Sequence, residues 1–166
     1  MNETENKFVV SRAKTLAREF LTRRPDVVPH LFDDKDLDFV VTLDPSASLK
    51  IQGFSPFGVI VWGTDKSITS KAAASNFATR QWKSVVERSA SNHKYFFPVI
   101  ALVYPVKDEV GYYAWISEPH FPTDGAPQLI PYQDLNCQEI LRNSLDNIVQ
   151  QVAEWYTRLE PVLLSA

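Results

Sequence analysis

The spacing of apolar residues along the chain predicts helices near both ends and one in the middle. Residues 6–23 place apolar side chains three and four positions apart, which is typical of an amphipathic helix, and Pro25 is expected to end it. Residues 69–91 follow the same helical spacing. A long C-terminal helix is expected to begin near Asn136 and to end at Pro161.

Between these helices the pattern changes to that of strands. Apolar and polar residues alternate over 36–44, and residues 57–62 are so continuously apolar that a strand buried on both faces is expected. Residues 49–54 fit a short pairing strand, and 95–106 with 110–117 fit a hairpin. The order of these elements predicts an α/β sandwich with a mixed central sheet of about five strands flanked by helices.

Proline-containing segments separate some of these elements, and no composition break divides the chain. The stretch with Pro25 and Pro29 and the stretch 119–131 are expected to be loops. At 166 residues, the whole of 1–166 is expected to form one domain. Its 45% hydrophobic and 22% charged residues are typical of a soluble globular protein.

The charge balance limits the possible partners. The net charge of -3 argues against a global basic field for nucleic acid, so such a partner would need a local basic surface. The polar face of the first helix is the most basic stretch, with Arg12, Lys14, Arg18, Arg23 and Arg24 beside Glu19.

The cysteine and hydropathy patterns predict a cytoplasmic protein without a membrane segment. Cys137 is the single cysteine, so no intrachain disulfide or cysteine-rich zinc site can form. His30, His93 and His120 lie far apart and lack a metal-binding spacing. The N-terminus carries no signal-peptide pattern, and no apolar run is long enough to span a membrane.

The strand that carries Asp38 and the later strand that ends in Gly63-Thr64 form the most informative pair. Together with the element order, this pair resembles the PD-(D/E)xK restriction-endonuclease-like superfamily over about residues 8–117. More narrowly, it looks like the small nuclease-like domains whose second core strand reads roughly phenylalanine-x-valine-glutamine-x-lysine-glycine-threonine. In that family a helix precedes the metal-binding aspartate and a longer helix follows Gly-Thr.

The resemblance implies a degenerate active site. In the family an aspartate and a neighbouring glutamate or glutamine hold divalent cations, and a lysine two residues later positions the attacking water. Asp38 matches the aspartate and Glu19 roughly matches a helix-borne acid, but Ile60 and Trp62 replace the second ligand and the lysine. Isoleucine has no ligand atom and tryptophan carries no charge. No catalytic residue and no cofactor are therefore expected, and Asp38 remains as a weak Mg²⁺ candidate.

Two alternatives remain open at this point. A lysine relocated to Lys66, Lys71 or Lys83 would restore an active nuclease that uses Asp38 and Glu19 with Mg²⁺ or Mn²⁺. The likeness to the nuclease core could also be accidental, in which case the chain is an unrelated α/β interaction module. In a purely structural role, Asp38 is expected to pair with Arg18 or Lys50 of the same chain.

The leading interpretation is a binding or regulatory module for a nucleic acid or a protein, in a defence or mobile-element system. A homodimer through residues 136–160, extended by an apolar patch at Leu163 and Leu164, is also considered. Aromatic residues are expected to supply anchors at an interface or stacking surfaces for a nucleic acid. The expected binding residues are Arg18, Trp62, Thr64, Arg80, Gln81 and Lys83. The candidate aromatic anchors are Trp62, Trp82, Tyr112, Tyr113, Trp115 and Tyr132.

Overall fold

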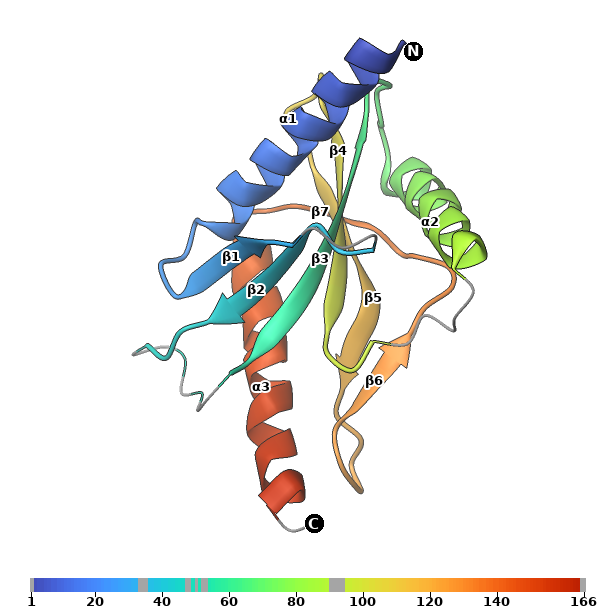
Figure 1. Ribbon diagram of the computed structural model, residues 1–166. Coiled ribbons are helices and arrows are strands. Elements are labelled where there is room, and N and C mark those ends of the chain that lie inside the picture. The colour runs from blue at the N-terminus through green and yellow to red at the C-terminus, as the bar shows by residue number, and fades with distance from the viewer. Residues whose placement is uncertain are drawn as a thin grey trace.

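The computed structural model describes residues 2–32, 36–46, 49, 51, 54–89 and 95–164. Helices and strands follow one another in a mixed α/β order, shown in Figure 1. The elements are α1 (Glu3–Leu21), β1 (Val27–Leu31), β2 (Phe39–Leu43), β3 (Pro56–Thr64), α2 (Lys71–Arg88), β4 (Val99–Pro105), β5 (Tyr112–His120), β6 (Gln128–Pro131), β7 (Gln138–Glu139) and α3 (Ser144–Leu164). Within these residues, no helix is both long and apolar enough to cross a membrane.

The strands form one mixed sheet in the order β1-β2-β3-β4-β5-β6, and β7 pairs with β5. The β3–β4 pair is parallel and is connected through α2, whereas the other pairs are antiparallel. This arrangement confirms the predicted α/β architecture with its mixed sheet and long C-terminal helix. The strand that follows Asp38 and the strand that contains Trp62 are neighbours, as expected from the sequence.

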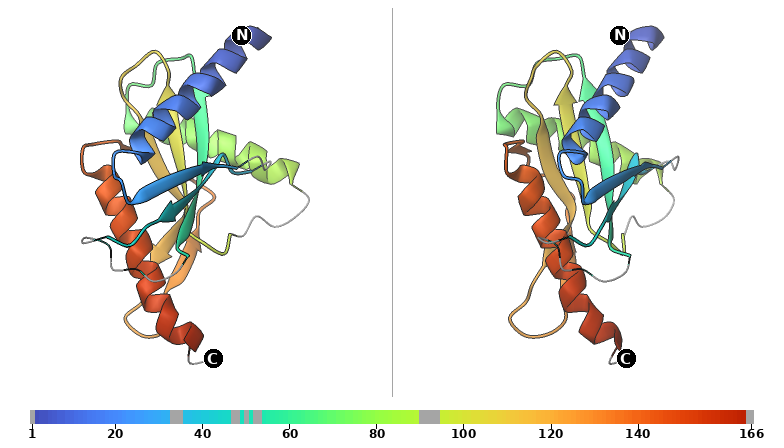
Figure 2. Two further views of the ribbon diagram at one scale, coloured as in Figure 1. Left: turned by 60° about the vertical axis from the view of Figure 1, so that its left-hand side comes forward. Right: turned by 90° about the vertical axis from the view of Figure 1, so that its left-hand side faces the viewer.

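Two apolar layers hold the helices against the sheet. Buried side chains of α1 and α3 share one cluster with β1, β2, β3 and β4. Buried side chains of α2 belong to a second cluster, which includes Ile60 on β3 and Ala114 on β5. α1 and α3 therefore cover one face and α2 covers the other. Figure 2 shows α3 running along the sheet and extending beyond it toward the C-terminus.

α1 packs very closely on β3 because β3 has a glycine at the contact. A Cβ atom placed on Gly63 would lie 2.8 Å from the Cβ of Ala13 and 3.0 Å from the carbonyl oxygen of Val9. No side chain fits in that space without moving the helix. The Gly63-Thr64 pair noted in the sequence thus has a packing role.

A polar cluster connects the end of α1 to β1 and α3. The Arg24 guanidinium donates to both carboxylate oxygens of Asp26, at 2.9 and 2.7 Å, and to Asp146 at 2.8 Å. Ser46 donates a further hydrogen bond of 2.9 Å to Asp26. These hydrogen bonds, with Arg24 first among the causes, lower the pKa of the buried Asp26 carboxyl from its ordinary value.

Two of the segments expected to be loops contain strands. β1 includes Pro29 and lies at the edge of the sheet, where a missing backbone N–H is tolerated because one side of the strand has no partner. β6 lies inside the stretch 119–131 and pairs with the end of β5. The loop expectation was wrong at these places, because pairing with the neighbouring strand along the chain stabilises short strands that have little apolar pattern of their own.

The predicted ends of the C-terminal helix were wrong as well. α3 begins at Ser144, eight residues after Asn136, and the intervening chain includes β7. Pro161 lies inside α3 rather than at its end. Leu145, Ile148, Val149, Val152 and Ala153 of this helix pack into the core. The side chains of Leu163 and Leu164 lie outside the described residues. Of the expected strand 49–54, residues 50, 52 and 53 also lie outside them, and the described residues Leu49, Ile51 and Phe54 belong to no strand.

Candidate functional site

Asp38 immediately precedes β2 and forms hydrogen bonds with the backbone of β3. Its Oδ2 accepts a hydrogen bond of 2.7 Å from the backbone N–H of Val61, and its own backbone N–H donates to the Val59 carbonyl at 2.9 Å. The carboxylate therefore takes the place of a backbone acceptor beside β3. It satisfies a backbone donor that would otherwise lack a partner at this point of the sheet.

The second oxygen of Asp38 faces a lysine from α1. Lys14 Nζ lies 3.4 Å from Asp38 Oδ1, and the side chains of Lys14 and Asp38 are 41% and 24% exposed. The sequence pointed to Arg18 or Lys50 as this partner instead. Arg18 lies one helical turn beyond Lys14, and Lys50 is outside the described residues. Lys14 was missed as a site residue, although its place on the basic side of the helix was a signal.

Ile60 and Trp62 point to the opposite side of the sheet from α1. Ile60 is buried in the cluster beneath α2, and the half-buried Trp62 packs against that cluster. Asp38, by contrast, contacts Lys14 of α1. The three motif positions therefore do not converge on one point where a cation could be held between them.

Glu19 does not join Asp38 either. It is exposed and lies five residues after Lys14, about 140° further around the helix. Its charge acts on Tyr104 of β4, whose pKa is raised mainly by burial and additionally by Glu19.

Two of the three candidate replacement lysines, Lys71 and Lys83, belong to α2, and Lys66 follows the end of β3. Lys66 is exposed, and its backbone N–H donates to Thr64 Oγ1 at 3.1 Å. Lys71 Nζ lies 3.4 Å from Gln138 Oε1, and Lys83 Nζ lies 3.3 Å from Asp134 Oδ1. The contacts of Lys71 and Lys83 are therefore with the chain around β7.

The predicted binding residues are divided between two surfaces. Arg18 belongs to α1, whereas Arg80, Gln81 and Lys83 belong to α2 on the other face of the sheet. Thr64 is buried, and its hydroxyl accepts from the turn that follows β3. The structure does not bring these residues together into one groove.

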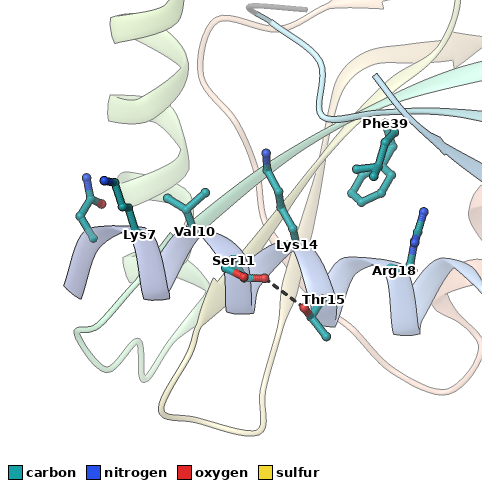
Figure 3. A pocket seen from close by; sticks show the side chains of 9 residues that line it. Lys7, Val10, Ser11, Lys14, Thr15, Arg18 and Phe39 are labelled. Carbon is teal, nitrogen blue, oxygen red and sulfur yellow. Dashed lines mark hydrogen bonds between the residues drawn. The ribbon is translucent and has the colours of Figure 1, made fainter. Parts of the chain in front are cut away.

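A groove beside α1 is the best candidate for a binding site. Its volume is about 490 Å³, and it lies between α1, the end of β1 and the start of β2 (Figure 3). Three of its lining residues are cationic and none is acidic. The groove, called the α1 groove below, is lined by Asn6, Lys7, Val10, Ser11, Lys14, Thr15, Arg18, Leu31 and Phe39.

Helical spacing aligns the cations of the α1 groove. Lys7, Lys14 and Arg18 recur at intervals of seven and four residues, and Figure 3 shows them rising from the same side of α1. Lys7 forms an exposed ion pair with Glu3 at 2.8 Å, which competes weakly with an external anion. The Arg18 side chain has no ion pair or hydrogen bond within the described part of the chain.

Both oxygens of the Asp38 carboxylate have partners within the chain. Mg²⁺ requires several hard oxygen ligands at short distance, and here one carboxylate already bonds to Val61 and Lys14. Among the described residues, no group of three or more His, Cys, Asp or Glu side chains is placed to hold a metal. Comparison of the chain with protein-family models, curated proteins and solved structures gives no match.

Proposed function

We propose that this protein is a non-catalytic, nuclease-like binding domain whose α1 groove holds the phosphate backbone of a nucleic acid. The observation that carries this proposal is the lining of the groove. Three cations and no carboxylate line one depression on a protein whose net charge is -3. Clustered cations of this kind attract phosphates even when the protein as a whole is acidic.

The contacts of Asp38 support the absence of catalysis. In a metal-dependent nuclease this carboxylate has to be available to a cation together with a second oxygen ligand and a lysine. Here both carboxylate oxygens have protein partners, Val61 and Lys14. The position of the second ligand is the buried Ile60, which offers no donor atom.

The remaining lining of the groove suits a sugar–phosphate chain. Ser11 and Thr15 carry hydroxyls that can donate to phosphate oxygens, although Thr15 Oγ1 now donates to the Ser11 carbonyl at 3.1 Å. Val10 and Leu31 are 45% and 65% exposed and offer apolar contact to sugars or bases. The contacts proposed here are to phosphates and sugars, which carry no sequence information directly, so binding independent of sequence is expected.

Fluorescence anisotropy with labelled single- and double-stranded DNA and RNA tests this proposal. The double variant Lys7→Ala/Arg18→Ala should bind at least tenfold more weakly at low salt. The slope of log K against log salt should become shallower by about 1.4 for a single strand, because two phosphate contacts are lost. Both substitutions leave the Asp38–Lys14 pair intact.

The double variant Arg80→Ala/Lys83→Ala is the charge-matched control. It removes two cations from the opposite face of the sheet and should retain wild-type affinity. Equal weakening by both double variants would mean that binding is diffuse and does not depend on the α1 groove. No binding of any nucleic acid by the wild-type protein would overturn the proposal and favour a protein partner.

A further inference from the structure

The outer edge of β5 is covered at both ends but not in the middle. β7 pairs with Tyr112 and Tyr113, and β6 pairs with Ser117 to His120. Residues 114–116 of β5 have neither strand beside them. The stretch 114–116, called the edge gap below, receives one hydrogen bond of 2.9 Å from the Tyr132 N–H to the Ile116 carbonyl.

Helix α2 holds the intervening chain away from this edge. The Trp82 indole N–H donates to the Tyr132 carbonyl at 3.0 Å. The Thr79 and Ser75 hydroxyls accept from the backbone N–H groups of Leu135 and Cys137, both at 2.9 Å.

The three α2 residues, at positions 75, 79 and 82, lie on one side of the helix because they are spaced four and three residues apart. The side chains of Leu135 and Cys137 are buried beneath α2. Segment 132–137 is therefore fixed on α2, and these contacts keep it from pairing with β5 at the edge gap.

The space left at the edge gap is a pocket of about 350 Å³. Tyr113 and Trp115 pack against the core cluster beneath α1 and α3, whereas Tyr132 packs against the cluster beneath α2. The pocket thus opens at the sheet edge, with aromatic rings from both sides. Its lining residues are Tyr113, Ala114, Trp115, Glu118, Tyr132, Asp134, Asn136, Gln138 and Gln151.

The charge of this pocket is opposite to that of the α1 groove. Glu118 and Asp134 are acidic, and none of the nine lining residues is cationic. Glu118 Oε2 accepts a hydrogen bond of 2.7 Å from the Tyr132 hydroxyl, which fixes the carboxylate beside an aromatic ring. Glu118 forms no ion pair with the described residues, whereas the more exposed Asp134 pairs with Lys83. The pocket therefore contains the negative charge of Glu118, which Tyr132 holds in place, and no cation among its lining residues.

We propose that the edge-gap pocket binds a weakly hydrated organic cation, such as an alkylated ammonium group. Aromatic rings attract a cation over their faces, and a nearby carboxylate neutralises its charge. Asn136 and Gln151 provide amide oxygens at the rim. An anion would be repelled by Glu118, and a neutral ligand would leave this carboxylate without a counter-charge. The proposal does not depend on nucleic-acid binding at the α1 groove.

The test compares choline with its neutral isostere 3,3-dimethyl-1-butanol. ¹H–¹⁵N spectra of the full chain are recorded during each titration at constant ionic strength. The Trp115 indole signal, assigned with a Trp115→Phe variant, should shift in a saturable way with choline. The neutral alcohol should bind at least tenfold more weakly. Because both ligands are tested on the wild-type protein, the comparison of their affinities does not depend on the folding of a variant.

A pair of variants locates the charge that is responsible. Glu118→Gln keeps an oxygen acceptor for Tyr132 but loses the charge, so choline affinity should fall at least tenfold. Asp124→Asn removes an exposed charge outside the pocket lining and should leave affinity unchanged. Three results would overturn the proposal: no saturable shift, equal binding of the alcohol, or unchanged affinity in Glu118→Gln.

Discussion

Replacing Asp38 with alanine distinguishes a structural carboxylate from a catalytic one. In the structure Asp38 accepts a 2.7 Å hydrogen bond from the Val61 N–H and forms an ion pair with Lys14. A hydrogen bond to a charged group contributes about 1.5–3 kcal/mol to stability. A half-exposed ion pair contributes less than about 1 kcal/mol, since water and salt screen it.

We expect Asp38→Ala to lower the free energy of unfolding by about 2 kcal/mol, because the hydrogen bond is the larger contribution and Asp38 is partly exposed. For a domain of this length, that loss corresponds to a decrease in Tm of about 4–8 °C. Urea unfolding followed by tryptophan fluorescence measures the free-energy change. Asp38→Asn retains an acceptor oxygen for Val61 and should lose about half as much. Lys14→Met removes the ion pair alone and should cost less than about 1 kcal/mol.

The same variants test catalysis directly. Wild-type protein and Asp38→Ala are incubated with single- and double-stranded DNA and RNA in Mg²⁺ or Mn²⁺, and neither is expected to cleave. If the Asp38→Ala variant is at least as stable as wild type, the structural role of this carboxylate is refuted. Cleavage by wild type that disappears in Asp38→Ala would show that a relocated lysine restores an active nuclease.

Three further predictions concern packing and ionisation. Asp26→Asn should destabilise the protein at neutral pH, because the native pKa of Asp26 is held below its ordinary value near 3.8, chiefly by Arg24. The difference in free energy of unfolding between wild type and this variant should be largest above that value and should shrink as the pH falls below it. Urea titrations at several pH values measure this difference. Gly63→Ala should cost about 1–3 kcal/mol through the clash with Ala13, and a change below about 0.5 kcal/mol would contradict the tight contact. Burial raises the pKa of Cys137 to about 11, so a thiol reagent at pH 8 should react with it only after unfolding.

The sequence predicted the elements that bury a regular apolar face. The spacing of residues 6–23 and 69–91 identified α1 and α2, and the continuous apolar stretch 57–62 identified β3, because burial on a helix or strand has a local period. The adjacency of β2 and β3 was also predicted, from the order of the elements and the family resemblance. The homodimer, the nucleic-acid partner and the family itself stay predictions.

Tertiary structure alone decided the short strands and both candidate sites. β7 has too few residues for a recognisable period, and β1 contains Pro29 and has no clear alternation; both are strands because β5 and β2, respectively, pair with them. Asp38 pairs with Lys14 and not with Arg18 as predicted. Each residue of a helix lies about 100° further around its axis, so the rotation of α1 against the sheet decides which side chain reaches Asp38. Contacts such as that of Ala13 with Gly63 set this rotation. The edge gap depends on hydrogen bonds between α2 and segment 132–137, whose bonded residues are 50 to 62 positions apart in sequence. A local pattern reports which face of an element is apolar, whereas these sites depend on which elements meet and at what angle.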